Sequence, residues 1–126
     1  MRWLVDGMNV IGSRPDGWWK DRHAAMVSLV ESLERWSEHS GEQVTVVFER
    51  APRPAISSEV IEIAYAPRAR RDSADDEIVR RVGLDPRPDE LRVVSSDHGL
   101  AKQVLAAGAA METAGRYRRL IESHSG

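Results

Sequence analysis

The sequence predicts a three-layer α/β domain built on a mostly parallel sheet. Short apolar or β-branched segments alternate along the chain with segments in which apolar residues recur at helical spacing, and this alternation is typical of helices packed on a parallel sheet. The run at 44–48 is β-branched or apolar throughout, as expected for a strand covered on both faces. No repeat, low-complexity tract or linker interrupts the 126 residues, so we expect residues 1–126 to form a single domain.

The first half of the chain predicts a strand, a long helix and two further strands. Residues 2–5 form a short run that ends at an Asp-Gly pair, which favours a strand followed by a turn, and residues 12–17 are rich in loop formers. Between about 20 and 39 apolar residues recur at helical spacing, and Gly41 is well placed to end that helix with a positive φ. The strand at 44–48 cannot continue into the proline-rich segment at 51–54, and the alternating segment at 60–65 predicts a less central strand.

The second half predicts a helix, a strand, a helix, a strand and a helix in turn. Residues 74–82 place Ile78, Val79 and Val82 on one face of a helix, and residues 91–94 form another buried strand. We expect a helix over 97–107 to end at Gly108. A last short strand at 110–113 and a last helix at 116–123 complete the alternation.

The composition excludes several classes of function. The chain has no cysteine, which excludes disulfides, thiolate metal sites and a cysteine nucleophile and fits a reducing compartment. No apolar run approaches the roughly 18 residues that span a bilayer, and the first residues lack the charged-then-apolar pattern of a signal peptide. We therefore expect a cytoplasmic protein without a membrane segment. The net charge of −2 gives no overall attraction to nucleic acid.

Acidic residues follow the predicted strands or begin the helices after them. Asp6 ends the first strand, Glu49 follows the second, and Asp97 follows the strand at 91–94. Asp75 and Asp76 begin the helix at 74–82. Loops at the carboxyl ends of parallel strands share one edge of a sheet, so we expect these acids to meet in one cleft. Clustered carboxylates repel one another unless a cation lies among them, and a hard divalent ion such as Mg²⁺ takes oxygen ligands.

Each acid taken singly also has a structural explanation. Asp-Gly is a common turn, Ser73 followed by Asp76 is close to a capping box, and acids in a first helical turn gain about 0.3–1 kcal/mol from the helix dipole. The joint pattern favours a metal cluster. We expect no helix to begin directly after Asp6, so the helix dipole does not account for that acid. Asn9 adds a side-chain oxygen to the same loop. Together these residues indicate metal-dependent phosphodiester chemistry.

Other chemistries fit the sequence less well. A phosphatase of the haloacid dehalogenase type needs a second Asp two residues after the first, where this chain has Met8. The chain has no G-x-G-x-x-G after the first strand, no Walker A loop and no Gly-x-Ser-x-Gly elbow. His98, beside Asp97, is either a base or phosphate contact or a solvated helix residue.

A group of arginines follows the second and third strands. Its members are Arg50, Arg53, Arg68, Arg70 and Arg71. We interpret them either as a phosphate-binding rim for RNA, which an acidic cluster would need, or as solvated loop residues. For Trp18 and Trp19, core packing or a lid hinge is favoured over base stacking.

Four motifs carry a resemblance to a known family. They lie at 6–12 (Asp-Gly-Met-Asn-Val-Ile-Gly), 46–49 (Val-Val-Phe-Glu), 73–78 (Ser-Ala-Asp-Asp-Glu-Ile) and 94–97 (Val-Ser-Ser-Asp). With these motifs the chain resembles the NYN division of the PIN-like nucleases and, within it, the YacP-like family of bacterial endoribonucleases. It departs from the family pattern at Met8, where an aromatic residue is usual, and at Glu49, where Asp is common.

The resemblance implies a PIN-like Rossmannoid sheet with strand order 3-2-1-4-5 and RNA cleavage that depends on Mg²⁺ or Mn²⁺. It implies metal-binding roles for Asp6, Asp75 and Asp97, with Asn9 and Asp76 in support. The role of Glu49 in place of the usual Asp stays open. Some members of the family act on ribosome-bound messages.

We therefore expect a metal-dependent endoribonuclease that cleaves single-stranded RNA with an activated water and leaves 5′-phosphate and 3′-hydroxyl ends. Two alternatives stay open. One is a non-catalytic RNA- or ribosome-binding module on the same fold, and the other is a small-molecule phosphohydrolase that uses the same acids. RNA is the expected partner of both the endoribonuclease and the binding module. The sequence leaves the oligomeric state open.

Overall fold

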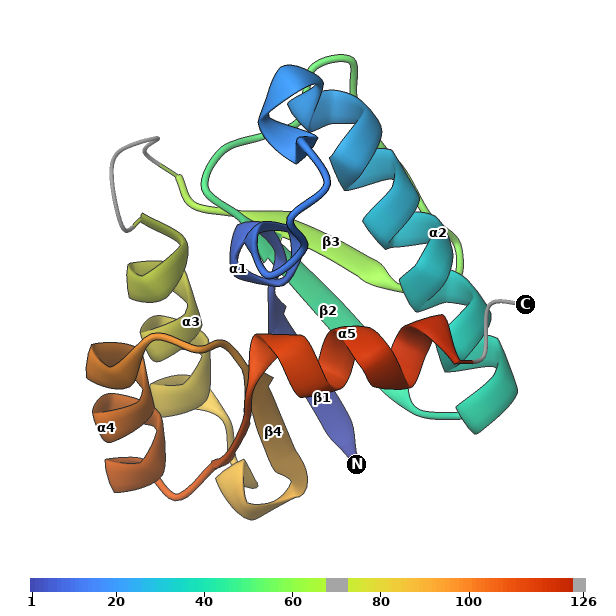
Figure 1. Ribbon diagram of the computed structural model, residues 1–126. Helices are drawn as coiled ribbons and strands as arrows, with labels where there is room; N and C mark the ends of the chain where they lie inside the picture. Colours follow the sequence, from blue (N-terminus) through green and yellow to red (C-terminus); the bar gives the residue numbers. More distant parts are fainter. Residues whose placement is uncertain (68–72, 124–126) are drawn as a thin grey trace.

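A five-stranded, all-parallel sheet forms the centre of the molecule (Figure 1). The computed structural model describes residues 1–67 and 73–123. The strand order is β3-β2-β1-β4-β5, which confirms the predicted fold class and order. The strands are β1 (Arg2–Asp6), β2 (Gln43–Phe48), β3 (Glu62–Tyr65), β4 (Leu91–Val94) and β5 (Ala110–Glu112). The helices are α1 (Gly7–Gly12), α2 (Arg22–Ser40), α3 (Ser73–Leu84), α4 (His98–Ala106) and α5 (Ala114–Glu122), with short 3₁₀ turns η1 (Trp18–Lys20) and η2 (Pro88–Glu90).

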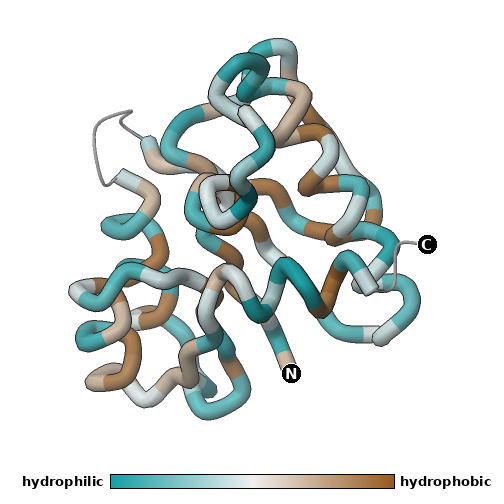
Figure 2. The backbone as a smooth tube through the Cα atoms, in the orientation of Figure 1, coloured by the Kyte–Doolittle hydropathy of each residue, from teal (hydrophilic) through white to brown (hydrophobic). Residues whose placement is uncertain are grey.

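Alternate residues of each central strand enter two separate hydrophobic cores. Trp3 and Val5 of β1 pack with residues of α1, α2 and α5, whereas Leu4 packs with residues of α3 and α4. This two-sided burial follows from the period of two in a strand and explains why the central strands are mostly apolar or β-branched. Figure 2 shows the resulting apolar stretches along the strands between the more polar outer segments.

The strand order reverses beside β1, and this reversal locates the candidate site. β1 pairs with β2 on one side, where Asp6 lies opposite Val47, and with β4 on the other, where Val5 lies opposite Val94. In open parallel sheets, ligands bind outside the carboxyl ends of the strands at the point where the order reverses. The start of α1, directly after β1, and the loop after β4 flank this point.

The start of α1 differs from the expectation that no helix follows Asp6 at once. α1 begins at Gly7, directly after β1. A Cβ atom at residue 7 would lie 2.6 Å from Cε1 of Phe48, so the helix can turn this close to β2 only because residue 7 is glycine. Burial and the charge of Asp75 raise the pKa of Asp6 by more than the backbone N–H of Asn9, in the first turn of α1, lowers it, so contact with the start of the helix does not account for this acid.

Several helices end where the sequence indicates. Gly41 after α2 has φ of 74° and Gly108 after α4 has φ of 95°, the left-handed conformation expected of glycine at a helix end. The last helix begins earlier than predicted, at Ala114, because the Thr113 side chain caps it by accepting from the backbone N–H of Arg116. Within the described residues, none of the helices combines the length and apolarity needed to cross a membrane.

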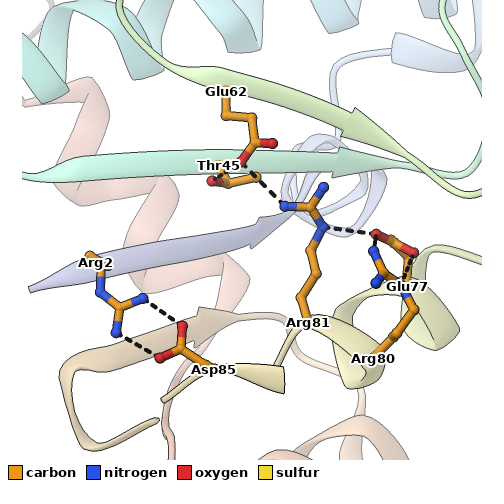
Figure 3. Close-up of polar contacts among 7 residues, drawn as sticks. All are labelled: Arg2, Thr45, Glu62, Glu77, Arg80, Arg81 and Asp85. Atoms are coloured by element: carbon orange, nitrogen blue, oxygen red, sulfur yellow. Dashed lines mark hydrogen bonds and ion pairs between the residues drawn. The ribbon is translucent and has the colours of Figure 1, made fainter. Parts of the chain in front are cut away.

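A chain of ion pairs ties α3 to the sheet (Figure 3). The Glu77 carboxylate accepts from Arg80 Nη2 at 2.6 Å and from Arg81 Nε at 2.8 Å. Arg81 also reaches Glu62 on β3 at 3.2 Å. The two arginines hold the pKa of Glu77 at about 2 although its side chain is buried. The Glu77 pairs lie within α3, and the Arg81–Glu62 contact joins this helix, whose first turn carries Asp75, to β3.

Candidate active site

Asp6 is a buried carboxylate at the carboxyl end of β1. Only 6% of its surface is exposed. Its Oδ2 accepts a hydrogen bond of 3.1 Å from the hydroxyl of Ser95, the first residue after β4. Ser95 is itself buried. The contact therefore joins the end of β1 to the loop after β4 at the strand-order reversal.

Negative charges from two other segments act on Asp6. Burial, and then the charge of Asp75, raise the pKa of Asp6 to about 7, and Glu49 adds to the rise. The Ser95 hydroxyl and the backbone N–H of Asn9 act in the opposite direction. The start of α3 and the end of β2 therefore bring their carboxylates close enough to disfavour the charged form of Asp6. This agrees with the predicted gathering of acids from distant parts of the sequence.

A hydrogen-bond network holds the loop after β4 against the start of α1. The Ser95 hydroxyl accepts from the backbone N–H of Asp97 at 3.2 Å, and Oδ1 of Asn9 accepts from the backbone N–H of Ser96 at 2.9 Å. Oδ1 of Asp97 caps α4 by accepting from the backbone N–H of Leu100 at 2.8 Å. The backbone of Asp97 is thus linked to the Asp6 carboxylate through one hydroxyl group, and Asn9 joins α1 to the loop after β4.

Ser73 connects the end of β2 to the first turn of α3. It is buried, and its hydroxyl donates to the backbone carbonyl of Glu49 at 2.9 Å. This contact places the start of α3 beside Glu49, and Asp75 is half-buried while Asp76 is exposed on the same turn. The geometry explains how Asp75 comes close enough to act on Asp6.

The donor set fits a hard divalent ion. Asp6 and Asp75 offer carboxylate oxygens, and an ion would offset the repulsion that raises the pKa of Asp6. In the part of the chain that the structure describes, no three acidic or histidine side chains form a ready-made metal-binding group. Mg²⁺ commonly takes one or two direct carboxylates and keeps several waters, and Asp6 and Asp75 are the residues that would supply those carboxylates.

The other residues singled out by the sequence are placed as follows. Arg50 and Arg53 are exposed and line a pocket together with Glu49. His98 is exposed at the first residue of α4. Trp18 packs against the core, as expected, whereas Trp19 is exposed. Three of the predicted RNA contacts, Arg68, Arg70 and Arg71, lie outside the described residues.

Sequence reasoning missed the two serines that organise this site. Ser95 contacts Asp6, and Ser73 contacts the backbone of Glu49. Both had a signal in the sequence, because each lies just before a predicted acid in a Ser-x-Asp segment at the carboxyl edge of the sheet. Their burial could not be read from that pattern, since a serine in such a position is usually an exposed cap.

The chain matches a family model and resembles solved structures. The model of the YacP-like NYN domain matches residues 3–125. The crystal structure of Rae1 (YacP) from Bacillus subtilis superposes with a TM-score of 0.82 at 22% identity, covering 98% of this chain and 74% of that chain. A crystal structure of a mutant of the same Bacillus subtilis protein gives a TM-score of 0.77 at 22% identity, covering 97% and 77%. Among proteins with curated functions, none matches the sequence.

Proposed function

Since the chain belongs to the YacP-like NYN domain family, a nuclease-type family, we propose that it is a metal-dependent endoribonuclease that cleaves single-stranded RNA. The observation that carries the proposal is the buried Asp6 carboxylate, whose pKa burial and the nearby acids raise to about 7. A desolvated acid surrounded by further acids at the strand-order reversal is unfavourable for stability and is typical of functional sites. A bound cation would offset the repulsion between these carboxylates.

Asp6, Asp75 and Asp97 are the residues proposed to hold Mg²⁺ or Mn²⁺. When bound, such an ion lowers the pKa of a coordinated water and offsets charge on the phosphate. Asn9 and Asp76 support the site. Glu49, whose carboxylate already acts on Asp6, is proposed to orient water at the same edge.

The chain's own groups position these acids. The Ser95 hydroxyl fixes the Asp6 carboxylate and the backbone of Asp97, and the Asn9 side chain fixes the backbone of Ser96. A site held by such contacts pre-organises the reacting groups. Water is the proposed nucleophile and the 3′-oxygen the proposed leaving group, so the P–O3′ bond breaks and the products carry 5′-phosphate and 3′-hydroxyl ends.

Arginines are proposed to hold the RNA backbone. Arg50 and Arg53 are exposed beside Glu49, and Arg68, Arg70 and Arg71 follow β3 in the sequence. Phosphate contacts of this kind position the strand without reading its sequence. Cleavage of a ribosome-bound message should be compared with cleavage of free RNA.

Replacing Asp97 by Asn tests the proposal. Asn ranks with Asp as a helix cap, so we expect α4 and the melting temperature to be preserved, while cleavage falls at least about 100-fold, the upper end of what a merely orienting partner of a metal ligand costs. The assay follows cleavage of an end-labelled single-stranded RNA in Mn²⁺, and a 5′-phosphate-dependent exonuclease checks the product ends. Glu90→Gln, which alters an exposed ion pair with Arg87, is the matched control.

Other outcomes separate the alternatives. An Asp97→Asn protein that cuts at the wild-type rate would remove Asp97 from the site. Wild-type protein that binds RNA but cuts none in either metal would indicate a binding module. Hydrolysis confined to small phosphate esters would indicate a phosphohydrolase.

A further inference from the structure

A pocket of about 520 Å³ opens beside the acidic site. It lies between α1, the start of α2 and the segment after β2, and Met8, Met26, Phe48 and Glu49 are among its lining residues. Met8 follows Asp6 by two residues, and the Glu49 carboxylate acts on Asp6. The pocket is therefore adjacent to the proposed reaction centre. Its volume falls within the roughly 300–1,000 Å³ of pockets that hold small ligands.

The floor of the pocket is apolar. Phe48 is 1% exposed, and Met8 and Met26 are partly buried and pack against the same hydrophobic core. Methionine side chains adapt to the shape of a partner and make favourable contacts with aromatic rings. Such a floor suits a flat aromatic group better than a sugar or a phosphate.

The rim of the pocket is cationic. Three arginines, Arg22, Arg50 and Arg53, line it together with His23, and Glu49 is the one acid among the described lining residues. The Arg22 guanidinium lies 5.3 Å from the centre of the Trp18 ring, a cation–π contact that restrains its position. His23 Nε2 lies 2.8 Å from the carbonyl oxygen of Pro54 and so joins α2 to the loop after β2. Arginines held in this way are suited to phosphate oxygens.

We propose that this pocket is a nucleotide subsite that takes one base of the RNA on its apolar floor and the attached phosphate at its arginine rim. The assignment rests on the proposed function, since it makes the ligand a nucleotide of the strand being cleaved. Glu49 lines the pocket and its carboxylate also acts on Asp6, so the bound nucleotide is a neighbour of the cleaved phosphodiester. The base is held by stacking and van der Waals contact, which are tolerant of base identity.

Methionine methyl NMR provides a direct test with internal controls. The chain has four methionines, of which Met8 and Met26 line the pocket, whereas Met1 is at the amino terminus and Met111 packs against the α3–α4 core. Protein labelled at the methionine methyl groups is titrated with UMP or AMP in EDTA, so that neither metal nor cleavage is involved. We expect saturable shifts of Met8 and Met26 from the ring current of the base, with Met1 and Met111 unmoved.

Ribose 5-phosphate and two arginine variants complete the experiment. The mononucleotides should bind at least about fivefold more tightly than ribose 5-phosphate, which lacks the base. Arg22→Ala should weaken UMP binding about tenfold, and Arg35→Ala, an exposed arginine farther along α2, should leave it unchanged.

Silent Met8 and Met26 signals, or equal binding of ribose 5-phosphate, would overturn the subsite. If RNA is still cut in that case, the nuclease proposal stands without it. Conversely, a pocket that responds to UMP in a protein that cuts no RNA would keep the nucleotide site and remove the nuclease.

Discussion

Asp6 carries a buried charge that its hydrogen-bond partners offset only in part. Its folded-state pKa of about 7 lies above its ordinary value of 3.8, with burial as the main cause and Asp75 next. An acid with a raised pKa favours the folded state when it is protonated. Its contribution to stability is therefore fully present below about pH 4 and is lost as the pH rises to about 7. In the absence of metal, ionisation of Asp6 at neutral pH should lower the free energy of unfolding.

Asp6→Asn should consequently stabilise the metal-free protein at pH 8 but not at pH 4. The amide is neutral at both values, keeps the shape of the side chain and can still accept from Ser95. The shift in pKa corresponds to an upper value on the order of 4 kcal/mol. Urea unfolding of both proteins in EDTA at the two pH values measures the difference, and a difference that does not change with pH would mean that Asp6 is not strained by its charge.

At the scale of elements, the contact between α1 and β2 sets the position of the site. Asp6 ends β1, and Asn9 and Met8 lie in the first turn of α1. The closeness of Gly7 to the Phe48 ring fixes how this turn leaves the sheet. A side chain at residue 7 has to displace either the ring or the helix.

Gly7→Ala should therefore destabilise the fold by about 1–3 kcal/mol, the usual cost of overpacking a core. Gly83, near the end of α3, is the matched control because a Cβ there meets nothing within 4 Å. Gly83→Ala should stabilise by about 0.5–1 kcal/mol, since alanine loses less backbone entropy in a helix. Urea unfolding midpoints compare the two variants, and equal effects of both would show that the Phe48 contact is not limiting.

The ion pairs of α3 predict a second, acid-dependent effect. Hydrogen bonds from Arg80 and Arg81 lower the pKa of Glu77 from 4.5 to about 2. This stability is present above about pH 4.5 and is lost as the pH falls toward 2. Glu77→Gln should cost about 1–3 kcal/mol at pH 7, whereas Glu90→Gln in an exposed pair should change stability by less than about 0.5 kcal/mol. If the two variants unfold alike, the Glu77 network does not hold α3.

At the scale of the whole molecule, the sequence was sufficient for the order of helices and strands. Largely apolar or β-branched strands, glycine helix ends and the alternation of elements each have a local cause, so they could be read directly from the sequence. The strand order came from the family resemblance, because nothing in local pattern says which strands pair across the sheet. The helix directly after Asp6 was missed because an Asp-Gly pair looks like a turn unless the contact of Gly7 with Phe48 is known.

The sequence could indicate which acids follow the strands of the sheet but not the contacts that support them. Acids that end strands of a parallel sheet must share an edge, and the charges of Asp75 and Glu49 do act on Asp6. The roles of Ser95 and Ser73 depend on which loops meet, and the pocket beside Glu49 depends on how α2 packs over β2. Both are properties of tertiary packing. The metal ligands themselves stay predictions.

A crystal soaked in Mn²⁺ tests the central claim, a divalent ion held among these acids, most directly. The anomalous signal of Mn²⁺ locates the ion without reference to activity, and Asp6→Asn crystals treated in the same way are the control. We expect a peak within coordination distance of Asp6 and Asp75, with Asp97 bound directly or through water, and no peak there in the variant. Wild-type crystals with no ion at Asp6, or variant crystals that keep the peak, would contradict the account.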